Sequence, residues 1–267
     1  MKPLFSIILP VFNEAENIQP LIEQIVETVT GGPYEIIVVD DNSPDGTARI
    51  VADIAQHIPA LRCIVRMHDR GLIPSIREGI ETAAADIVVW MDADCSMSPR
   101  LIPRMVAMVQ AGTDLVLGSR YIKGGGIKGV DPCAEKTSIF SIWNNLHTSE
   151  DSFFSVMVSM FGNLLLRWIL RGTLHDFSSG YFCGRKKVIQ EIGLAGIFVD
   201  YCISLPYNAV MHGYQVAEIP MILVPRRHGQ SKTSFTVSGV IIIAWQCLLK
   251  AVILRLSVKD ERKKHNR

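Results

Sequence analysis

The sequence predicts a single α/β domain with a mainly parallel central sheet, followed by an apolar helix near the C-terminus. Strand-like apolar runs alternate with segments of helical periodicity through the first half of the chain, and this alternation builds parallel sheets through right-handed crossovers. Hydrophobic residues make up 48% of the 267 residues, which is enough for one full core.

Four strands are expected in the first half, and each is an apolar run of strand length. The second is a continuous β-branched run, which is typical of a strand buried on both faces. These strands are expected at 5–10, 35–40, 61–66 and 87–91. Three helices separate them, with apolar residues spaced by three and four. These helices are expected at 16–30, 48–56 and 76–84.

The second half of the chain is less regular. We expect strands at 114–118 and 216–224. Between them lie a glycine-rich loop at 124–126, which we expect to be mobile, and a polar segment at 131–152 without assigned structure. The expected helices of this half lie at 153–170, 188–193 and 201–212. We divide the chain into a domain at 1–235 and an apolar helix with a basic tail at 236–267.

Charge and cysteine content exclude several classes of protein. Lys and Arg number 27 against 26 Asp and Glu, which argues against a nucleic-acid partner. The six cysteines include no Cys-x-x-Cys pair, which argues against a zinc ribbon and a secreted disulfide framework. Reduced thiols and a cytoplasmic location are therefore expected.

Polar residues follow three of the four expected strands of the first half. Asn13 and Glu14 lie at the end of the first strand, Asp40 and Asp41 at the end of the second, and Asp92 and Asp94 at the end of the fourth. In parallel sheets, ligands bind beyond the carboxyl ends of the strands. The pattern predicts a carboxylate-rich site at one edge of the sheet.

Asp92 and Asp94 have the spacing of a metal-binding pair. Two carboxylates one residue apart at a strand end can both face a divalent cation, and Mg²⁺ takes one or two carboxylates together with substrate phosphates. Such a cation would neutralise a departing nucleotide phosphate. A solvated acidic turn is the alternative interpretation of this motif.

Seven segments together resemble the family 2 glycosyltransferases, and the dolichol-phosphate mannosyltransferase branch in particular. The resemblance covers residues 4–126 and 160–235. The segments that carry it are 5–14 (FSIILPVFNE), 38–47 (VVDDNSPDGT), 70–72 (RGL), 91–94 (MDAD), 118–121 (GSRY), 176–181 (DFSSGY) and 226–232 (RRHGQSK).

This resemblance implies a GT-A fold, which is a Rossmann-like nucleotide-sugar-binding domain. It implies inverting transfer of mannose or glucose from GDP-mannose or UDP-glucose to a polyprenyl phosphate, with Mg²⁺ or Mn²⁺ as cofactor. By position, the residues expected to bind the nucleotide sugar are Pro10, Phe12, Asn13, Glu14, Val39, Asp41, Arg70 and Ala93. The metal ligands expected in the same way are Asp92, Asp94 and Ser96.

The residues expected to act in catalysis are Asp92, Asp94, Arg120, Asp176, Arg226 and Lys232. The three basic residues among them would meet phosphates, since Arg binds two oxygens with its planar fork and Lys acts as a point charge. No His–Asp base pair is obvious, and an acceptor phosphate, already ionised, needs little help from a base.

Departures from the family pattern leave two other functions open. Where the family usually has Gly-Leu-Gly, this chain has Gly71-Leu72-Ile73. The polar residue after the Asp-x-Asp motif is Ser96, which has a short side chain, and an insertion at 131–151 replaces a basic segment of the family. Asp200 is the candidate for the acidic residue before the late helix. One alternative is a glycosyltransferase of this fold that acts on a glycan or a soluble acceptor. The other is an inactive nucleotide-sugar-binding scaffold.

The C-terminal apolar segment predicts a helix at a membrane interface. The longest apolar stretch, at 237–249, is short for a helix that spans a bilayer, which takes roughly 20 apolar residues. Trp245 suits the lipid–water boundary, Lys250 and Arg255 can reach head groups, and a basic tail follows. We expect a peripheral protein at the cytoplasmic face of a membrane. The alternative is a helix that packs on the catalytic domain or pairs with a second copy of the chain.

Overall fold

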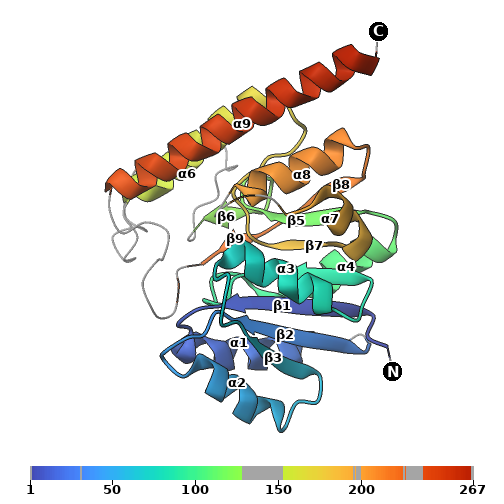
Figure 1. Cartoon of the computed structure of the whole chain (residues 1–267), viewed down its shortest axis with the longest axis vertical. Coiled ribbons are helices and arrows are strands. Elements are labelled where there is room, and N and C mark those ends of the chain that lie inside the picture. Colours follow the sequence, from blue (N-terminus) through green and yellow to red (C-terminus); the bar gives the residue numbers. More distant parts are fainter. Residues whose placement is uncertain are drawn as a thin grey trace.

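The computed structural model describes residues 2–30, 32–127, 153–194, 196, 200–224, 226 and 237–265 (Figure 1). Two sequence predictions, the polar insertion at 131–152 and the site residue Lys232, lie outside the described residues.

A seven-stranded sheet forms the centre of the molecule, in the order β3-β2-β1-β4-β7-β5-β8. Every neighbouring pair is parallel except the two pairs made by β7. The predicted mainly parallel α/β sheet is thus confirmed. The strands are β1 (Phe5–Val11), β2 (Tyr34–Asp40), β3 (Leu61–Val65), β4 (Ile87–Trp90), β5 (Leu115–Ser119), β7 (Phe182–Arg185) and β8 (Val216–Pro220).

Helices cover both faces of this sheet. One core cluster packs against α1 (Ala15–Thr28), α2 (Thr47–Ala55) and α4 (Ile102–Gln110). The other packs against α3 (Leu72–Thr82), α6 (Phe153–Leu170), α7 (Lys186–Ile192) and α8 (Tyr201–Met211). Successive β1 side chains alternate between the clusters, Ile7 and Leu9 to the first and Ile8 to the second.

The strand order creates the crevice that a ligand site needs. The chain moves outward from β1 through β2 to β3 and then returns to place β4 on the other side of β1. Ligands bind at such a switch point, beyond the carboxyl ends of the strands. Gly79 lets α3 lie close over this region, because a side chain there would overlap Ile8.

The prediction of a single strand at 216–224 is wrong, because this segment forms two strands. The strand β8 ends at Pro220, and β9 (Ile222–Leu223) pairs instead with β6 (Gly126–Ile127) in a separate two-stranded sheet. The glycine segment expected to be a mobile loop is packed there. A Cβ on Gly125 would lie 2.5 Å from the carbonyl oxygen of Ser119, so glycine is needed for this close approach.

The C-terminal helix α9 (Val237–His265) lies alongside α6 and also contacts α8 (Figure 1). Ala251 is buried in the core cluster, and the Lys250 ammonium lies 3.7 Å from the Asp200 carboxylate. The inner face of α9 therefore packs on the sheet domain. Within the described ranges, none of the helices combines the length and apolar character needed to cross a bilayer.

Candidate functional site

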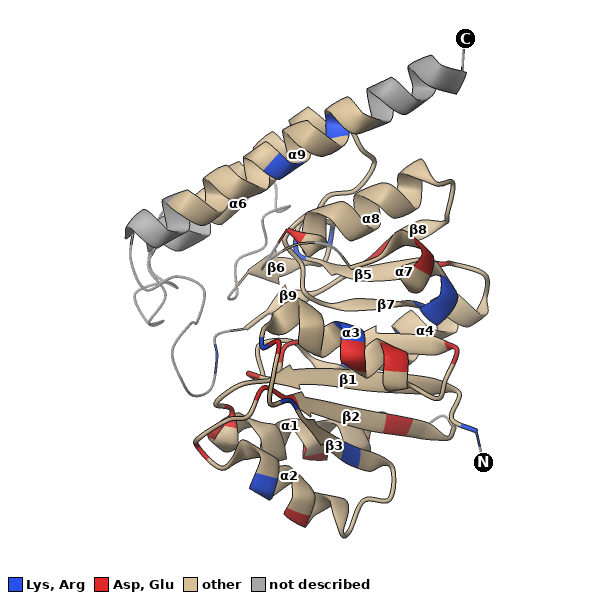
Figure 2. Cartoon of the chain, viewed as in Figure 1, with Lys and Arg blue, Asp and Glu red and all other residues tan. Residues whose placement is uncertain are grey.

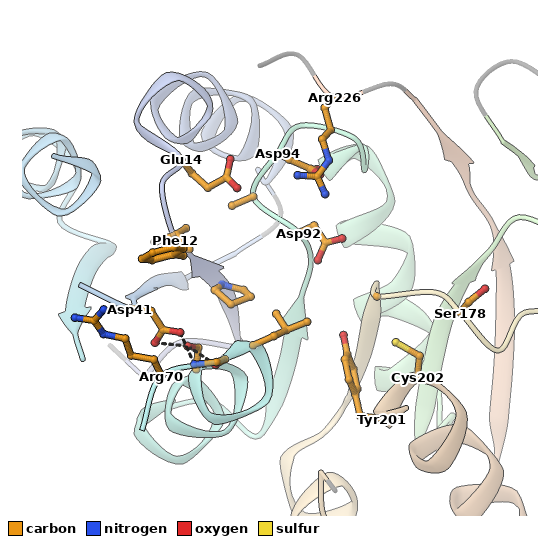
Figure 3. Close-up of a pocket in the computed structure, with 17 residues that line it drawn as sticks. Phe12, Glu14, Asp41, Arg70, Asp92, Asp94, Ser178, Tyr201, Cys202 and Arg226 are labelled. Atoms are coloured by element: carbon orange, nitrogen blue, oxygen red, sulfur yellow. Dashed lines mark hydrogen bonds and ion pairs between the residues drawn. The ribbon is translucent and has the colours of Figure 1, made fainter. Parts of the chain in front are cut away.

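A cavity of about 570 Å³ opens at the carboxyl ends of β1, β2 and β4 (Figure 3). Its lining contains Pro10, Val11, Phe12, Glu14, Asp41, Arg70, Gly71, Leu72, Ser75, Asp92, Ala93, Asp94, Ser178, Gly180, Tyr201, Cys202 and Arg226. The strand-end rule used on the sequence thus places the cavity correctly.

The loop after β1 is fixed by side chains from the loop after β2. The Asn13 amide donates to Ser43 Oγ (2.9 Å) and the Glu14 amide to Thr47 Oγ1 (3.0 Å). The Ala15 amide donates to Asp45 Oδ2 (3.0 Å). These bonds satisfy backbone donors at the start of α1 that have no partner within the helix. They also hold the neighbouring cavity residues in place.

Asp41 is held in a buried ion pair at one end of the cavity. Its Oδ1 accepts from Arg66 Nη1 (2.6 Å) and Ser75 Oγ (2.8 Å), and its Oδ2 accepts from the Gly71 amide (2.6 Å). A carboxylate has about four acceptor positions, so one position on Oδ2 is left for a ligand. Burial works against the charge of Arg66, but Glu78 and Asp41 outweigh it and raise the pKa of the guanidinium.

Asp92 and Asp94 lie at the centre of the cavity, at the end of β4 (Figure 3). Asp94 Oδ1 accepts from the Ser96 amide (3.0 Å), and Asp94 Oδ2 lies 3.0 Å from Arg226 Nε. Gly180 lies next to Asp92, since a Cβ there would be in ordinary contact with Oδ1 at 3.5 Å. The two carboxylates therefore face a shared space, with a cation already beside one of them.

The donor set suits Mg²⁺ or Mn²⁺ in the presence of a diphosphate. No cluster of three or more His, Cys, Asp or Glu occurs among the described residues, so the protein alone offers only a partial shell. Mg²⁺ in proteins is commonly bound by one or two carboxylates, with substrate phosphates and waters completing its coordination. Asp92 and Asp94 would supply those carboxylates.

Arg120 forms a buried fork with Asp176 beside the carboxylate pair. Its Nε donates to Asp176 Oδ2 (2.8 Å), and its Nη2 donates to Asp176 Oδ1 (2.8 Å) and Ser178 Oγ (2.6 Å). Burial favours a neutral carboxyl, but Arg120 overcomes it and lowers the pKa of Asp176. Arg120 also lines a second cavity of about 210 Å³, shared with Asp92, Asp94, Ser96 and Arg226.

The loop that carries Asp176 is held from two sides. Glu218 on β8 accepts from the His175 and Asp176 amides at 3.0 Å, and its Oε2 lies 2.7 Å from the His175 ring. From α6, Asn163 donates to the His175 carbonyl (2.5 Å) and accepts from the Phe177 amide (2.9 Å). This network fixes the loop and hence the Arg120 fork.

Most of the sequence-predicted site residues come together here. Those that line the main cavity are Pro10, Phe12, Glu14, Asp41, Arg70, Asp92, Ala93, Asp94 and Arg226. Ser96 and Arg120 line the second cavity, and Asp176 lies behind them as the partner of Arg120. Two further predicted residues also lie outside both linings: Val39 is in the core, and Asn13 is exposed beside the main cavity.

Sequence reasoning missed Arg66, Tyr201 and Cys202. Arg66 directly follows β3, so the strand-end rule could have found it. Tyr201 and Cys202 begin α8 and reach the cavity only through the packing of that helix on the sheet. No local pattern marks them.

Comparison with protein families identifies the chain. Residues 6–193 match the family model described as glycosyl transferase family 2. The chain belongs to this family. It is 30% identical over 234 residues to dolichol-phosphate mannosyltransferase of Pyrococcus furiosus, covering 85% of this chain and 58% of that protein's length. It is 29% identical over 235 residues to polyprenol monophosphomannose synthase of Mycolicibacterium smegmatis, covering 85% of this chain and 80% of that protein's length.

Solved glycosyltransferase structures share the fold. Glucosyl-3-phosphoglycerate synthase of Mycobacterium tuberculosis, in complex with Mn²⁺, UDP-glucose and phosphoglyceric acid, matches with a TM-score of 0.64 at 17% identity, covering 95% of this chain and 80% of that one. A complex of the same enzyme with Mg²⁺ and UDP matches with a TM-score of 0.61. The GT-A fold expected for the family 2 glycosyltransferase is thus confirmed.

Proposed function

We propose that this glycosyltransferase moves a hexose from GDP-mannose or UDP-glucose to a polyprenyl phosphate, with inversion and with Mg²⁺ or Mn²⁺ bound. The observation that carries this proposal is the order of groups in the site. A buried Asp41–Arg66 pair at one end leads to the Asp92 and Asp94 carboxylates, and Arg120 and Arg226 lie beside them. The names of the two curated relatives support the choice of acceptor.

Each part of the donor has a suitable partner along the cavity. Asp41 offers one acceptor position to a base, and Phe12 and Arg70 flank the same end (Figure 3). Asp92 and Asp94 would hold the metal, and the metal would neutralise the charge that develops on the leaving nucleoside diphosphate. The acceptor oxygen attacks the anomeric carbon from the opposite side as the bond to the diphosphate breaks.

The carboxylates of the cavity favour an acceptor that is already an anion. Those in the described lining are Glu14, Asp41, Asp92 and Asp94. Glu14 accepts from Asn17, Asp41 is paired with Arg66, and the other two form the metal motif. A sugar hydroxyl acceptor would need a general base in reach, whereas a lipid phosphate needs cations that position it. This distribution supports a phosphate acceptor over a glycan, and the charged residues described at the site argue against an inactive scaffold.

The outer faces of α6 and α9 support work at a membrane. Their exposed large apolar side chains are Phe161, Leu164, Leu165, Trp168, Ile242, Trp245, Leu249, Val252, Ile253 and Leu256. Between residues 242 and 257 of α9 there is no acidic residue, and Lys250 and Arg255 are the charged residues of that stretch (Figure 2). Large groups of exposed apolar side chains mark protein or membrane contacts. We place the protein at the cytoplasmic face of the membrane that holds its lipid acceptor.

A donor and acceptor screen on the purified full chain tests the proposal. Wild-type protein with Mn²⁺ should glycosylate a short polyprenyl phosphate from GDP-mannose or UDP-glucose, and chelator should abolish turnover. The matched polyprenyl alcohol should not react. Asp94→Asn should lose most activity while the protein stays folded, because the position lies in a turn. Equal turnover with the alcohol, or transfer only to soluble glycans, would overturn the acceptor assignment.

A further inference from the structure

Beyond the carboxylate pair, the cavity continues to the first turn of α8. Tyr201 and Cys202 line this end together with Ser178 and Gly180. The Tyr201 side chain is almost completely buried, at 1% exposure, yet its hydroxyl points into the cavity towards Asp92 (Figure 3). A buried ring thus presents its polar end to the site.

The ring of Tyr201 is held by aromatic neighbours. It lies 6.1 Å from the Phe182 ring, measured between centroids, and Phe182 in turn stacks on Trp90 at 5.1 Å. Phe182 and Trp90 belong to β7 and β4, so two central strands fix the ring. A hydroxyl placed in this way loses little conformational entropy when it binds a ligand.

The hydroxyl stays protonated. Burial is the main cause that raises the pKa of Tyr201 well above its usual value. A neutral phenol can donate one hydrogen bond and accept others. It is therefore suited to a neutral polar partner.

The order of groups along the cavity says which part of the donor meets this hydroxyl. A nucleotide sugar is linear, with base, ribose, diphosphate and sugar in sequence. With the base at Asp41 and the diphosphate at Asp92 and Asp94, the sugar extends past the metal motif to Tyr201. We infer that the Tyr201 hydroxyl hydrogen-bonds a hydroxyl of the transferred sugar. This inference rests on the proposed function and makes Tyr201 a sugar-binding, catalytic residue.

Tyr201→Phe tests the inference, since it removes the hydroxyl and keeps the ring. Calorimetry with Mn²⁺ should give wild-type affinity for the nucleoside diphosphate. Affinity for the matching nucleotide sugar should fall by roughly tenfold, the worth of one hydrogen bond. The kcat should fall by about 10- to 100-fold, because bonds to sugar hydroxyls strengthen as charge develops at the anomeric carbon.

Tyr207→Phe is the matched control. Tyr207 lies on the same helix and is equally buried, and its hydroxyl has no hydrogen-bond partner within the described part of the chain. This variant should bind and react as wild type. Unchanged nucleotide-sugar affinity and kcat in Tyr201→Phe would overturn the inference, and so would an equal loss of diphosphate binding. If wild-type protein bound no nucleotide sugar at all, the proposed function itself would fail, which is a separate outcome.

Discussion

We expect the buried side chain of Asp41 to stabilise the fold and also to bind the donor. Its exposed fraction is 6%, and three protein donors already bind it, among them the guanidinium of Arg66. A ligand that binds the remaining acceptor position meets a carboxylate whose orientation is fixed before binding. Removing the side chain should therefore affect both folding stability and donor affinity.

Asp41→Ala should lower the free energy of unfolding by about 2–3 kcal/mol, because Arg66 loses a buried partner while Glu78 remains. Donor Kd should rise at least tenfold. Glu35→Ala is the control, since Glu35 pairs with Arg62 at the opposite end of β2. It should lower stability and leave donor Kd unchanged. Denaturant titration and calorimetry measure both, and intact donor binding in Asp41→Ala would restrict Asp41 to a structural role.

Arg226 should compete with a divalent cation. Its Nε lies 3.0 Å from Asp94 Oδ2. When no donor is bound, the guanidinium therefore balances the charge of Asp94, one of the two carboxylates proposed to hold the metal. Arg226→Ala should tighten Mn²⁺ binding to the nucleotide-free protein by about three- to tenfold, as expected for a partly exposed pair. Titration followed by electron paramagnetic resonance measures this.

Two variants control for that measurement. Arg226→Lys keeps the charge and should bind Mn²⁺ much as wild type does. Arg185→Ala removes a cation paired with Asp114, outside the cavity lining, and should have no effect. Unchanged or weaker Mn²⁺ affinity in Arg226→Ala would mean that the ion pair does not oppose the metal.

At the scale of elements, α6 connects the surface to the site. Its outward residues are apolar, whereas its inward Asn163 is 3% exposed and bonds the loop that carries Asp176. That loop fixes the Arg120 fork. A helix that the sequence marked only as apolar therefore also supports the residues proposed to act in catalysis.

Asn163→Ala should break both bonds to the loop and leave a buried amide and carbonyl without their partner. We expect a loss of about 2–3 kcal/mol of stability and roughly a tenfold lower kcat, with donor Kd unchanged because the nucleotide end is untouched. Leu166→Ala is the control, since it removes buried packing from the same helix and keeps both hydrogen bonds of Asn163 to the loop. A normal kcat in a folded Asn163→Ala protein would contradict the positioning role.

The sequence predicted the regular half of the fold and the centre of the site. Alternating strands and helices placed β1 to β4, and the strand ends then located Asp41, Asp92 and Asp94. The pattern failed where structure depends on distant partners. The four-residue strand β7 is defined only by antiparallel pairing with β4 and β5, and Tyr201 reaches the cavity only once α8 is packed.

At the scale of the whole molecule, most of the exposed large apolar side chains lie on α6 and α9. The helices α6 and α9 pack together, and the inner face of α9 covers α8, the helix whose first turn lines the cavity (Figure 1). Deleting α9 would therefore uncover buried surface as well as remove the outer face. Substitutions on the outer face alone separate membrane binding from folding.

The double variant Trp168→Gln with Trp245→Gln should lose membrane binding and keep its fold. The two side chains are 73% and 68% exposed, so their replacement removes little packing, and Tm should stay near that of wild type. Transfer of each indole into an interface is worth roughly 2 kcal/mol, so affinity for vesicles of phosphatidylcholine and phosphatidylglycerol should fall at least tenfold.

Leu4→Gln, at an exposed residue before β1, is the control and should bind as wild type. Sedimentation with vesicles measures the affinity, and sedimentation velocity without lipid measures the mass. If the double variant still binds vesicles fully but changes a wild-type dimer into a monomer, the outer face is an interface between two copies of the chain and not a membrane contact.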